Sequence, residues 1–174
     1  MNNYLPTDYQ AFIHTSRYAR WLDSEGRRES WPETVGRYMN DVVRRALDTD
    51  TIGIAKEIED AILSLNLMPS MRAMMTAGPA LDRDNTAGYN CSYLPVDDPK
   101  SFDEAMYILL CGTGVGFSVE RQFISKLPDV PELFESETTV VVKDSKEGWA
   151  KGFRQVLALL WAGEIPKWDV TRIR

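Results

Sequence analysis

The fold of this chain is decided by PKSFDEAMYILLCGTGVGFSV, residues 99–119. Up to Leu110 the apolar side chains recur every three or four residues, as they do on one face of an amphipathic helix. Gly112 follows at once, and glycine is favoured just beyond a helix C-terminus. Residues 114–119 then predict a short strand whose glycines permit close contact with a neighbour. A helix is therefore expected to lead directly into a strand in this segment.

The glycine-rich run from Gly112 to Gly116 does not fit two familiar phosphate-binding motifs. A dinucleotide-binding fingerprint follows a strand and opens a helix, whereas here the helix comes first. A P-loop would continue with Gly-Lys-Ser or Gly-Lys-Thr, which this sequence lacks at that point. Two interpretations of the glycines remain open: they let the backbone approach a flat ligand, or they allow tight packing of helix against strand.

Helices are expected on the N-terminal side of this region. Ser30, Pro32 and Glu33 combine a capping residue, a first-turn proline and an acid three residues after the cap, which together mark a helix start. The remaining apolar residues follow helical spacing. The sequence therefore predicts three helices, over residues 8–22, 30–46 and 52–65.

The rest of the chain alternates between loops and regular elements. Residues 68–98 are rich in proline, glycine and small polar residues and predict extended chain and loop. Residues 127–137 predict an acidic linker that contains prolines, and the β-branched run 138–142 predicts a strand. Asp144 or Ser145 then caps a helix to about Trp161, and residues 166–174 are expected to be extended.

Composition limits the classes of protein that this chain can represent. It has 174 residues, 44% of them hydrophobic, and a formal net charge of -6. An acidic balance does not support bulk binding of nucleic acid. No apolar run approaches the roughly 20 residues that a bilayer requires, and the N-terminus does not look like a secretory signal. With two cysteines and one histidine, neither a disulfide framework nor a metal site is expected.

The two cysteines have different surroundings. Cys91 lies among polar neighbours where a loop leads into a strand, and local sequence leaves two interpretations open. It is either a buried structural cysteine or an accessible redox thiol. Cys111 ends an apolar run, so we expect a core or helix-end cysteine without a catalytic role. A disulfide between the two is not required by anything in the sequence.

A group of polar residues stands at predicted helix starts. Carboxylates and hydroxyls there satisfy free backbone N–H groups and favour the positive end of the helix dipole, so capping alone explains them. These residues are Asp97, Asp98, Asp144 and Ser145. His14 is expected to be a packing or surface histidine rather than a metal ligand.

Six segments carry a resemblance to a known family when they are taken in order. They are Trp21–Val35, Met68–Arg72 with Met75–Gly78, Asn90–Ser92, Gly112–Glu120, Asp144–Trp149 and Trp168–Arg174. Together they resemble the N-terminal region of adenosylcobalamin-dependent, class II ribonucleotide reductases. The most similar type is the monomeric ribonucleoside-triphosphate reductase, phage versions included. The resemblance extends over nearly the whole chain.

The resemblance implies a fold that this chain leaves incomplete. A helical N-terminal region is followed by the first strands and helices of a ten-stranded α/β barrel. The expected division is a helical region (1–67), a first barrel part with the redox cysteine (68–126), a shortened effector-type insertion (127–149) and a continuing helix and strand (150–174). Such a chain is expected to be inactive alone, as a natural split subunit or as a truncated protein.

The resemblance also implies a reaction and residue roles. The family reduces ribonucleotides to deoxyribonucleotides for DNA synthesis by thiyl-radical chemistry, and Cys91 corresponds to the first member of its redox cysteine pair. The radical cysteine and the second redox cysteine belong to later segments. Substrate contacts are implied for Ser70, Asn90 and Gly114. Contacts with an allosteric effector are implied for Asp97, Asp98, Asp144 and Ser145.

Several partners follow from the same resemblance. The cofactor is adenosylcobalamin, bound mainly by segments absent from this chain. A ribonucleotide substrate, a deoxynucleotide effector, a C-terminal reductase chain or segment and a thioredoxin-type reductant are expected. Neither nucleic acid nor a membrane is expected as a partner. The location implied is the cytoplasm, which is that of the host if the chain is phage-encoded.

Two other functions are compatible with the sequence. A helical domain with a short sheet suits a non-catalytic interaction module that binds a protein partner, because an unfinished barrel exposes a strand edge. A stand-alone nucleotide-binding regulator is supported only by the glycine segment and the acidic helix starts. Substitution of Cys91 separates the enzyme from the interaction module, because only the enzyme needs the thiol.

Overall fold

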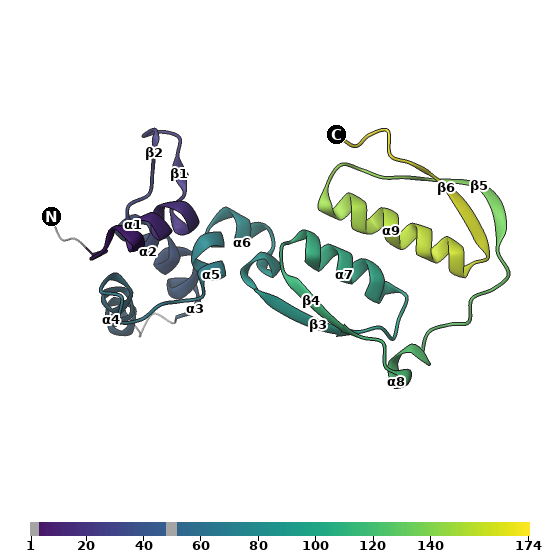
Figure 1. Cartoon of the computed structure of the whole chain (residues 1–174), viewed down its shortest axis with the longest axis horizontal. Coiled ribbons are helices and arrows are strands. Elements are labelled where there is room, and N and C mark those ends of the chain that lie inside the picture. The colour runs from purple at the N-terminus through teal and green to yellow at the C-terminus, as the bar shows by residue number, and fades with distance from the viewer. Residues whose placement is uncertain (1–3, 48–51) are drawn as a thin grey trace. The chain divides into compact units, whose positions relative to one another are not determined.

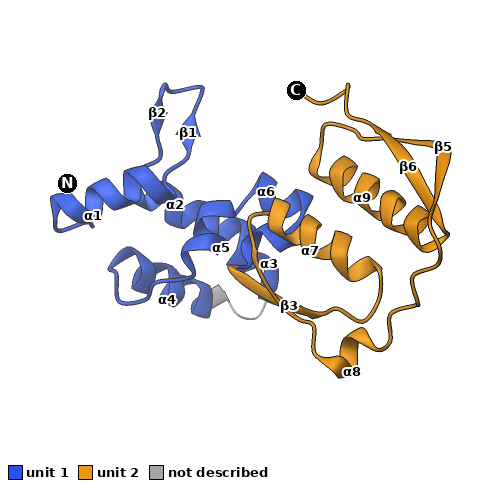
Figure 2. Ribbon diagram, turned by 45° about the vertical axis from the view of Figure 1, so that its right-hand side comes forward, with its two compact units in different colours: residues 1–89 blue, residues 90–174 orange. Residues whose placement is uncertain are grey.

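The computed structural model describes residues 4–47 and 52–174 (Figure 1). The chain forms two compact units, residues 1–89 and residues 90–174 (Figure 2). The first unit is mainly helical, and the second combines helices with parallel strand pairs. The protein therefore has the α/β character that the sequence predicts.

The first helix of the first unit begins where the sequence predicts. Helix α1 (Asp8–Ile13) continues into a π-helix, η1 (His14–Tyr18). A capping box fixes its start, because the Thr7 side chain accepts a hydrogen bond from the Gln10 backbone and the Gln10 side chain accepts one from the Thr7 backbone.

A short hairpin replaces the end of the helix predicted over residues 8–22. Strand β1 (Trp21–Leu22) pairs antiparallel with β2 (Arg27–Arg28). The Glu29 N–H donates to the Arg20 carbonyl at 2.8 Å and extends this pairing. The prediction is therefore wrong for the last residues of that helix, because pairing with a later segment overrides their apolar spacing.

The second predicted helix is confirmed at both ends. It consists of α2 (Trp31–Tyr38), a π-helical turn η2 (Met39–Val43) and α3 (Arg44–Ala46). The Ser30 N–H and hydroxyl both donate to the Glu33 carboxylate, at 2.6 and 2.7 Å, which forms the expected capping box.

Short helices occupy part of the region predicted to be extended. Within residues 68–98 the structure has α5 (Met71–Thr76), α6 (Pro79–Arg83) and a 3-10 helix, η4 (Asn85–Gly88). Ser70 caps α5 through its side chain. The prediction is wrong for these residues because helices this short show no apolar periodicity and depend on tertiary contacts.

The core of the first unit lies among α2, α4 (Ile52–Leu63) and α5, and α4 confirms the third predicted helix. Leu65, just beyond α4, has a φ of 61°, a left-handed conformation that costs a leucine on the order of 1 kcal/mol. Its side chain packs against the core and offsets this cost. The buried core residues are Trp31, Val35, Met39, Ala55, Ile62 and Met74.

A polar network is buried beside this core. The Arg37 guanidinium donates to both oxygens of Glu29, at 2.8 and 2.9 Å, and to backbone carbonyls of η1 and α5. The Thr34 hydroxyl donates to Glu29 at 3.0 Å. The Thr34 oxygen also lies 2.9 Å from Nε2 of His14, which is buried as a packing histidine, as expected.

Acid is expected to destabilise the first unit in two steps. Burial lowers the pKa of His14 below 6.5, although the Glu29 carboxylate opposes this shift. Below pH 6.5 the histidine of the unfolded chain therefore binds a proton that His14 of the folded chain does not. The free energy of unfolding falls as the pH is lowered from 6.5 to the pKa of His14 in the folded chain. Burial alone would raise the pKa of Glu29, but hydrogen bonds from Arg37, Arg20 and Thr34 hold this pKa below 4.5. A second decrease in the free energy of unfolding therefore begins as the pH falls below about 4.5.

Hydrogen exchange of the α2 amides at about pH 7.5 and about pH 5.5 measures the first step, because exchange reports unfolding of one unit separately. His14 is the single histidine of the sequence. The substitution His14→Gln should therefore remove the decline between these two pH values. A decline of equal size in His14→Gln would assign it to another group.

The second unit begins with a strand–helix–strand element. Strands β3 (Cys91–Pro95) and β4 (Gly114–Ser118) pair in parallel and are joined by α7 (Lys100–Leu110), which packs against both. Gly112, with a φ of 85°, ends the helix in the left-handed conformation that glycine accommodates. The predicted helix and strand of residues 99–119 are thus confirmed. A short helix, α8 (Arg121–Ile124), follows.

A second strand–helix–strand element completes the chain. Strands β5 (Phe134–Val141) and β6 (Glu164–Asp169) pair in parallel, joined by α9 (Lys146–Trp161), which packs against them. Ser145 caps α9, so the predicted helix is confirmed and the choice between two caps is decided. The linker predicted over residues 127–137 ends earlier, because β5 already begins at Phe134.

Candidate functional site

Cys91 is placed at the start of a strand with its thiol accessible. It is the first residue of β3, is exposed, and forms no disulfide. The carbonyl of the preceding Asn90 accepts a hydrogen bond from the Gly114 N–H at 3.0 Å. The parallel register sets Cys91 opposite Gly114. The interpretation of Cys91 as a buried structural cysteine is therefore wrong, and that of an accessible thiol remains.

Bare backbone lies beside this thiol. In the register of β3 and β4, Cys91 pairs with Gly114 and Tyr93 pairs with Gly116, and all four residues are exposed. A Cβ atom built on Gly114 would lie 3.5 Å from the Asn90 carbonyl oxygen, an ordinary van der Waals contact. Packing within the second unit does not require a glycine there. This favours the interpretation in which the backbone stays bare for a ligand.

The structure brings two of the three predicted substrate contacts together beside the predicted redox cysteine. Asn90, Cys91 and Gly114 adjoin one another at the start of the β3–β4 pair. The Ser92 hydroxyl donates to the Gly114 carbonyl at 3.1 Å and ties the two strands at this point. Ser70 lies in the first unit, where it caps α5.

The predicted effector residues before α7 have local structural partners. The Asp98 carboxylate accepts a hydrogen bond from the Lys100 N–H at 2.8 Å. Asp97 forms an ion pair with Lys126 at 3.1 Å. Asp98 therefore stabilises the turn that leads into the helix, although Pro99, and not Asp98, is the N-cap residue of α7.

The predicted effector residues before α9 are also engaged. The Ser145 hydroxyl accepts a hydrogen bond from the Gly148 N–H at 3.0 Å. The Asp144 carboxylate forms an ion pair with Arg174 at 2.6 Å. These contacts lie within the second unit and help to hold the start of α9.

The two pairs of effector candidates lie at opposite ends of a helix pair. Nζ of Lys146, at the start of α9, lies 3.2 Å from Sγ of Cys111, at the end of α7. The rings of Phe102 and Trp161, 6.1 Å apart, join the other two ends. The helices are therefore antiparallel, and 11 residues of α7 separate the pairs by roughly 16 Å. Cys111 is a helix-end cysteine, as expected.

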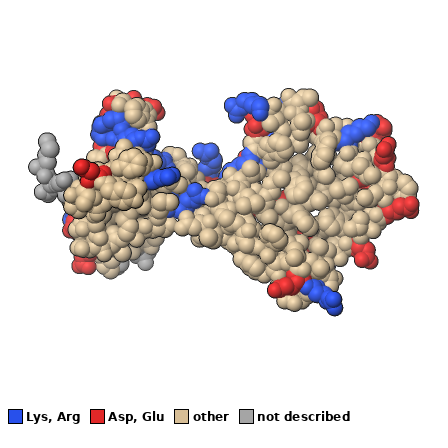
Figure 3. All heavy atoms as spheres, in the orientation of Figure 1, with Lys and Arg blue, Asp and Glu red and all other residues tan. Residues whose placement is uncertain are grey.

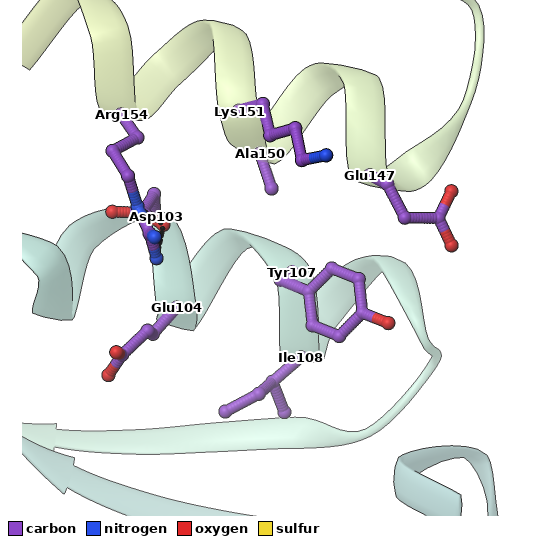
Figure 4. A pocket seen from close by; sticks show the side chains of 8 residues that line it. All are labelled: Asp103, Glu104, Tyr107, Ile108, Glu147, Ala150, Lys151 and Arg154. Atoms are coloured by element: carbon purple, nitrogen blue, oxygen red, sulfur yellow. Dashed lines mark hydrogen bonds and ion pairs between the residues drawn. The ribbon is translucent and has the colours of Figure 1, made fainter. Parts of the chain in front are cut away.

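Sequence reasoning missed an ion pair between these helices, formed by a buried carboxylate and a half-exposed arginine. Asp103 is 3% exposed, and its carboxylate accepts hydrogen bonds from the Arg154 guanidinium at 2.6 and 2.8 Å. These hydrogen bonds raise the pKa of Arg154. A carboxylate amid the apolar residues of α7 was the available signal. The pair borders a hollow of about 360 Å³ (Figure 4), also lined by Glu104, Tyr107, Ile108, Glu147, Ala150 and Lys151.

The described residues show few other features of functional sites. Among residues 4–47 and 52–174, no group of three or more His, Cys, Asp or Glu side chains is placed to hold a metal ion. Within the same ranges no helix is long and apolar enough to cross a membrane. On the face drawn in Figure 3, acidic and basic side chains are interspersed.

The fold is similar to that of a solved enzyme. A crystal structure of a B12-dependent, class II ribonucleotide reductase superposes with a TM-score of 0.77 and covers 94% of this chain and 32% of the solved chain. Sequence identity in that superposition is 20%. The fold of this chain is thus similar to that of a portion of a class II ribonucleotide reductase.

Sequence comparison agrees with the fold. The chain is similar to adenosylcobalamin-dependent ribonucleoside-triphosphate reductases of Lactobacillus delbrueckii subsp. bulgaricus (27% identity), Lactobacillus leichmannii (26%) and Levilactobacillus brevis (25%). In each case the match covers 76% of this chain and 22% of the relative. No protein-family model matches the chain.

This chain is therefore homologous to a portion of the adenosylcobalamin-dependent ribonucleoside-triphosphate reductases, which confirms the resemblance in its sequence. It spans about a fifth of the length of these curated relatives. The match to an enzyme over most of the chain favours the reductase over a non-catalytic interaction module.

Proposed function

We propose that this chain is the N-terminal part of a ribonucleotide reductase that reduces ribonucleotides to deoxyribonucleotides. The observation that carries the proposal is the exposed, free thiol of Cys91 beside the bare backbone of Gly114. It stands in a chain homologous to a portion of such enzymes. An accessible thiol at the start of a strand can meet both a substrate and a second cysteine.

The proposed role of Cys91 is to supply reducing equivalents. Its thiol and that of a second cysteine, supplied by another segment, form one disulfide and release two electrons and two protons. The ribose 2′-hydroxyl leaves as water, and a hydrogen atom takes its place on the 2′-carbon. A thioredoxin-type reductant then restores the two thiols by disulfide exchange. Asn90 and Gly114, which adjoin Cys91, would position the ribose through polar and backbone contacts.

The proposed architecture is part of a ten-stranded α/β barrel. The second unit contains two parallel strand pairs, each with a connecting helix, which are suitable building blocks for such a barrel. A strand with an unpaired edge tends to recruit another strand. In this proposal residues 68–126 and 150–174 belong to the barrel, and residues 127–149 form a shortened effector-type insertion. A C-terminal segment or chain completes the barrel.

Three hollows within the described parts of the two units are too small for a cobalamin. Hollows within the two units measure about 290, 360 and 430 Å³. Such volumes suit small ligands, and a cobalamin is far larger. We propose that adenosylcobalamin is bound mainly by other segments. A deoxynucleotide effector is proposed to bind near one of the helix starts at Asp97 and Asp98 or at Asp144 and Ser145.

Complementation tests the proposed function. The chain would be mixed with a polypeptide that covers the remaining length of a homologous reductase, adenosylcobalamin, a thioredoxin system and ribonucleoside triphosphates. Formation of deoxyribonucleotides is expected only when both polypeptides are present. A folded, stably associated mixture that produces none contradicts the proposal.

Substitution of Gly114 by alanine is expected to lower turnover without lowering the stability of the fold. The added Cβ meets only the Asn90 carbonyl at 3.5 Å, so the free energy of unfolding should change by less than about 0.5 kcal/mol. Turnover by the complemented enzyme should fall at least about tenfold, because the methyl group occupies space proposed for the substrate. Calorimetry and product formation measure the two effects.

Gly148 provides a matched comparison for that prediction. A Cβ there would lie 2.3 Å from the Lys143 carbonyl oxygen, so Gly148→Ala should destabilise the second unit by about 1–3 kcal/mol. If Gly114→Ala lowers stability as much as Gly148→Ala does, Gly114 is a packing residue and its proposed role is wrong.

A further inference from the structure

A second hollow lies wholly within the first unit, which contains none of Asn90, Cys91 and Gly114. It measures about 290 Å³, close to the lower limit for small-ligand pockets. Its walls come from the segment before α1, from α1, η1 and the start of α2, and from the segment after α4. None of the described residues that line it is acidic, lysine or arginine. Aromatic and aliphatic side chains predominate, among them Leu5, Tyr9, Ile13, Tyr18 and Trp31.

His14 supplies a polar group to this hollow in a definite protonation state. The Thr34 hydroxyl has one proton, and it is donated to the Glu29 carboxylate at 3.0 Å. The Thr34 oxygen must therefore accept from Nε2 of His14, 2.9 Å away, so Nε2 carries the imidazole proton. Burial lowers the pKa of His14 and keeps the ring neutral near pH 7. Its Nδ1 is then a hydrogen-bond acceptor.

This acceptor has no protein partner among the described residues. His14 is 5% exposed and lines the hollow. Its ring makes one hydrogen bond, through Nε2. The buried side-chain atoms that lack a hydrogen-bond partner do not include Nδ1. Because His14 lines the hollow, we infer that Nδ1 is reached from the hollow. A molecule in the hollow can satisfy Nδ1 only by donating an N–H or O–H.

The walls favour a flat ligand. The rings of His14 and Trp31 meet edge to face, with centroids 5.5 Å apart and an interplanar angle of 86°. The Trp31 indole is held by its Nε1–H, which donates to the Leu63 carbonyl at 3.1 Å. Tyr9 is 72% exposed, at the rim of the hollow. A planar ring can contact these aromatic surfaces at little cost in conformational entropy.

We propose that this hollow is a binding site for an uncharged planar aromatic ring that donates one N–H or O–H to Nδ1 of His14. The absence of charged side chains from its described lining excludes recognition of a phosphate or carboxylate there. The site belongs to the first unit, whereas Cys91 belongs to the second. The proposal does not rest on the proposed reductase function and can be tested separately.

Indole and N-methylindole are matched probes, since they have nearly the same shape and only indole has an N–H. Two-dimensional NMR of the full chain would follow the Trp31 indole N–H and the His14 ring protons during titration. Indole is expected to bind with a Kd on the order of 1 mM, usual for so small a molecule. N-methylindole is expected to bind about tenfold more weakly, because Nδ1 then lacks its donor.

Two variants sharpen this test. His14→Phe keeps an aromatic ring but has no acceptor, so it should bind the two probes equally. Tyr9→Ala removes an exposed ring from the wall of the hollow. It should weaken the binding of both probes while keeping the preference for indole. The proposal is overturned if the unmodified chain binds both probes equally, if His14→Phe keeps the preference, or if indole perturbs only signals of the second unit.

Discussion

Replacing Cys91 by serine is expected to lower deoxyribonucleotide formation by the complemented enzyme at least about 10³-fold, the scale on which loss of a chemically essential group acts. A serine hydroxyl cannot form a disulfide, so the two electrons needed for reduction have no source. The assay must use the thioredoxin-type reductant, because small dithiols can bypass a redox pair. Product measured by chromatography over single and multiple turnovers gives the rate.

Cys111→Ser is the matched control for this substitution. Cys111 ends α7 beside Lys146 and is assigned no part in the reaction, so turnover should stay within about twofold, as is usual for changes away from a site. Association of Cys91→Ser with the complementary polypeptide should be unchanged. Undiminished turnover in Cys91→Ser would refute the redox role and return the interaction module to consideration.

Replacing Arg37 by methionine is expected to lower the free energy of unfolding of the first unit by about 3–5 kcal/mol. The side chains of Arg37 and Glu29 are only 12% and 6% exposed. Methionine would leave the Glu29 carboxylate buried without its counter-ion. It would also remove the donor to the carbonyls of Tyr18, Met74 and Ala77. Hydrogen exchange of core amides in α2 and α4 gives the measurement.

Arg27→Met is the matched control, because it removes the same group from an exposed pair. Arg27 pairs with Glu25 and Glu33 at the surface, where both partners remain hydrated, so its loss should be much smaller. In the double variant Glu29→Gln, Arg37→Met, the loss should be less than the sum of the two single losses, because the buried charge is gone. A loss below about 1 kcal/mol in Arg37→Met would show that the pair does not stabilise the unit.

Local sequence was sufficient wherever an element is long and carries its own start and stop signals. The helix that begins at Ser30 has a capping box and a first-turn proline, and its predicted extent is confirmed. The helix and strand of residues 99–119 are confirmed because Gly112 separates two clear patterns. The prediction failed at residues 21–28 and 71–83, where a hairpin and short helices depend on contacts with distant segments.

For the candidate site too, the sequence predicted the residues within single motifs but not the contacts between distant segments. The ordered motifs singled out Cys91 and Gly114, and the β3–β4 register places them opposite each other. The motifs gave no sign of the Asp103–Arg154 pair, whose members are 51 residues apart. The four effector candidates were grouped by their likeness to a family, yet the antiparallel packing of α7 and α9 places them at two separate ends.

The sequence by itself singled out Cys91 as a candidate redox residue and predicted that a strand begins near it. It also showed the resemblance to a reductase family, because these predictions depend on local pattern and on the order of the motifs. Only the tertiary structure decided that the Cys91 thiol is exposed and that a bare glycine backbone adjoins it. The same holds for His14, whose tautomer depends on Thr34 and Glu29 together. Exposure, partners and protonation are properties of neighbours in space, and those neighbours are set by packing between segments that lie far apart along the chain.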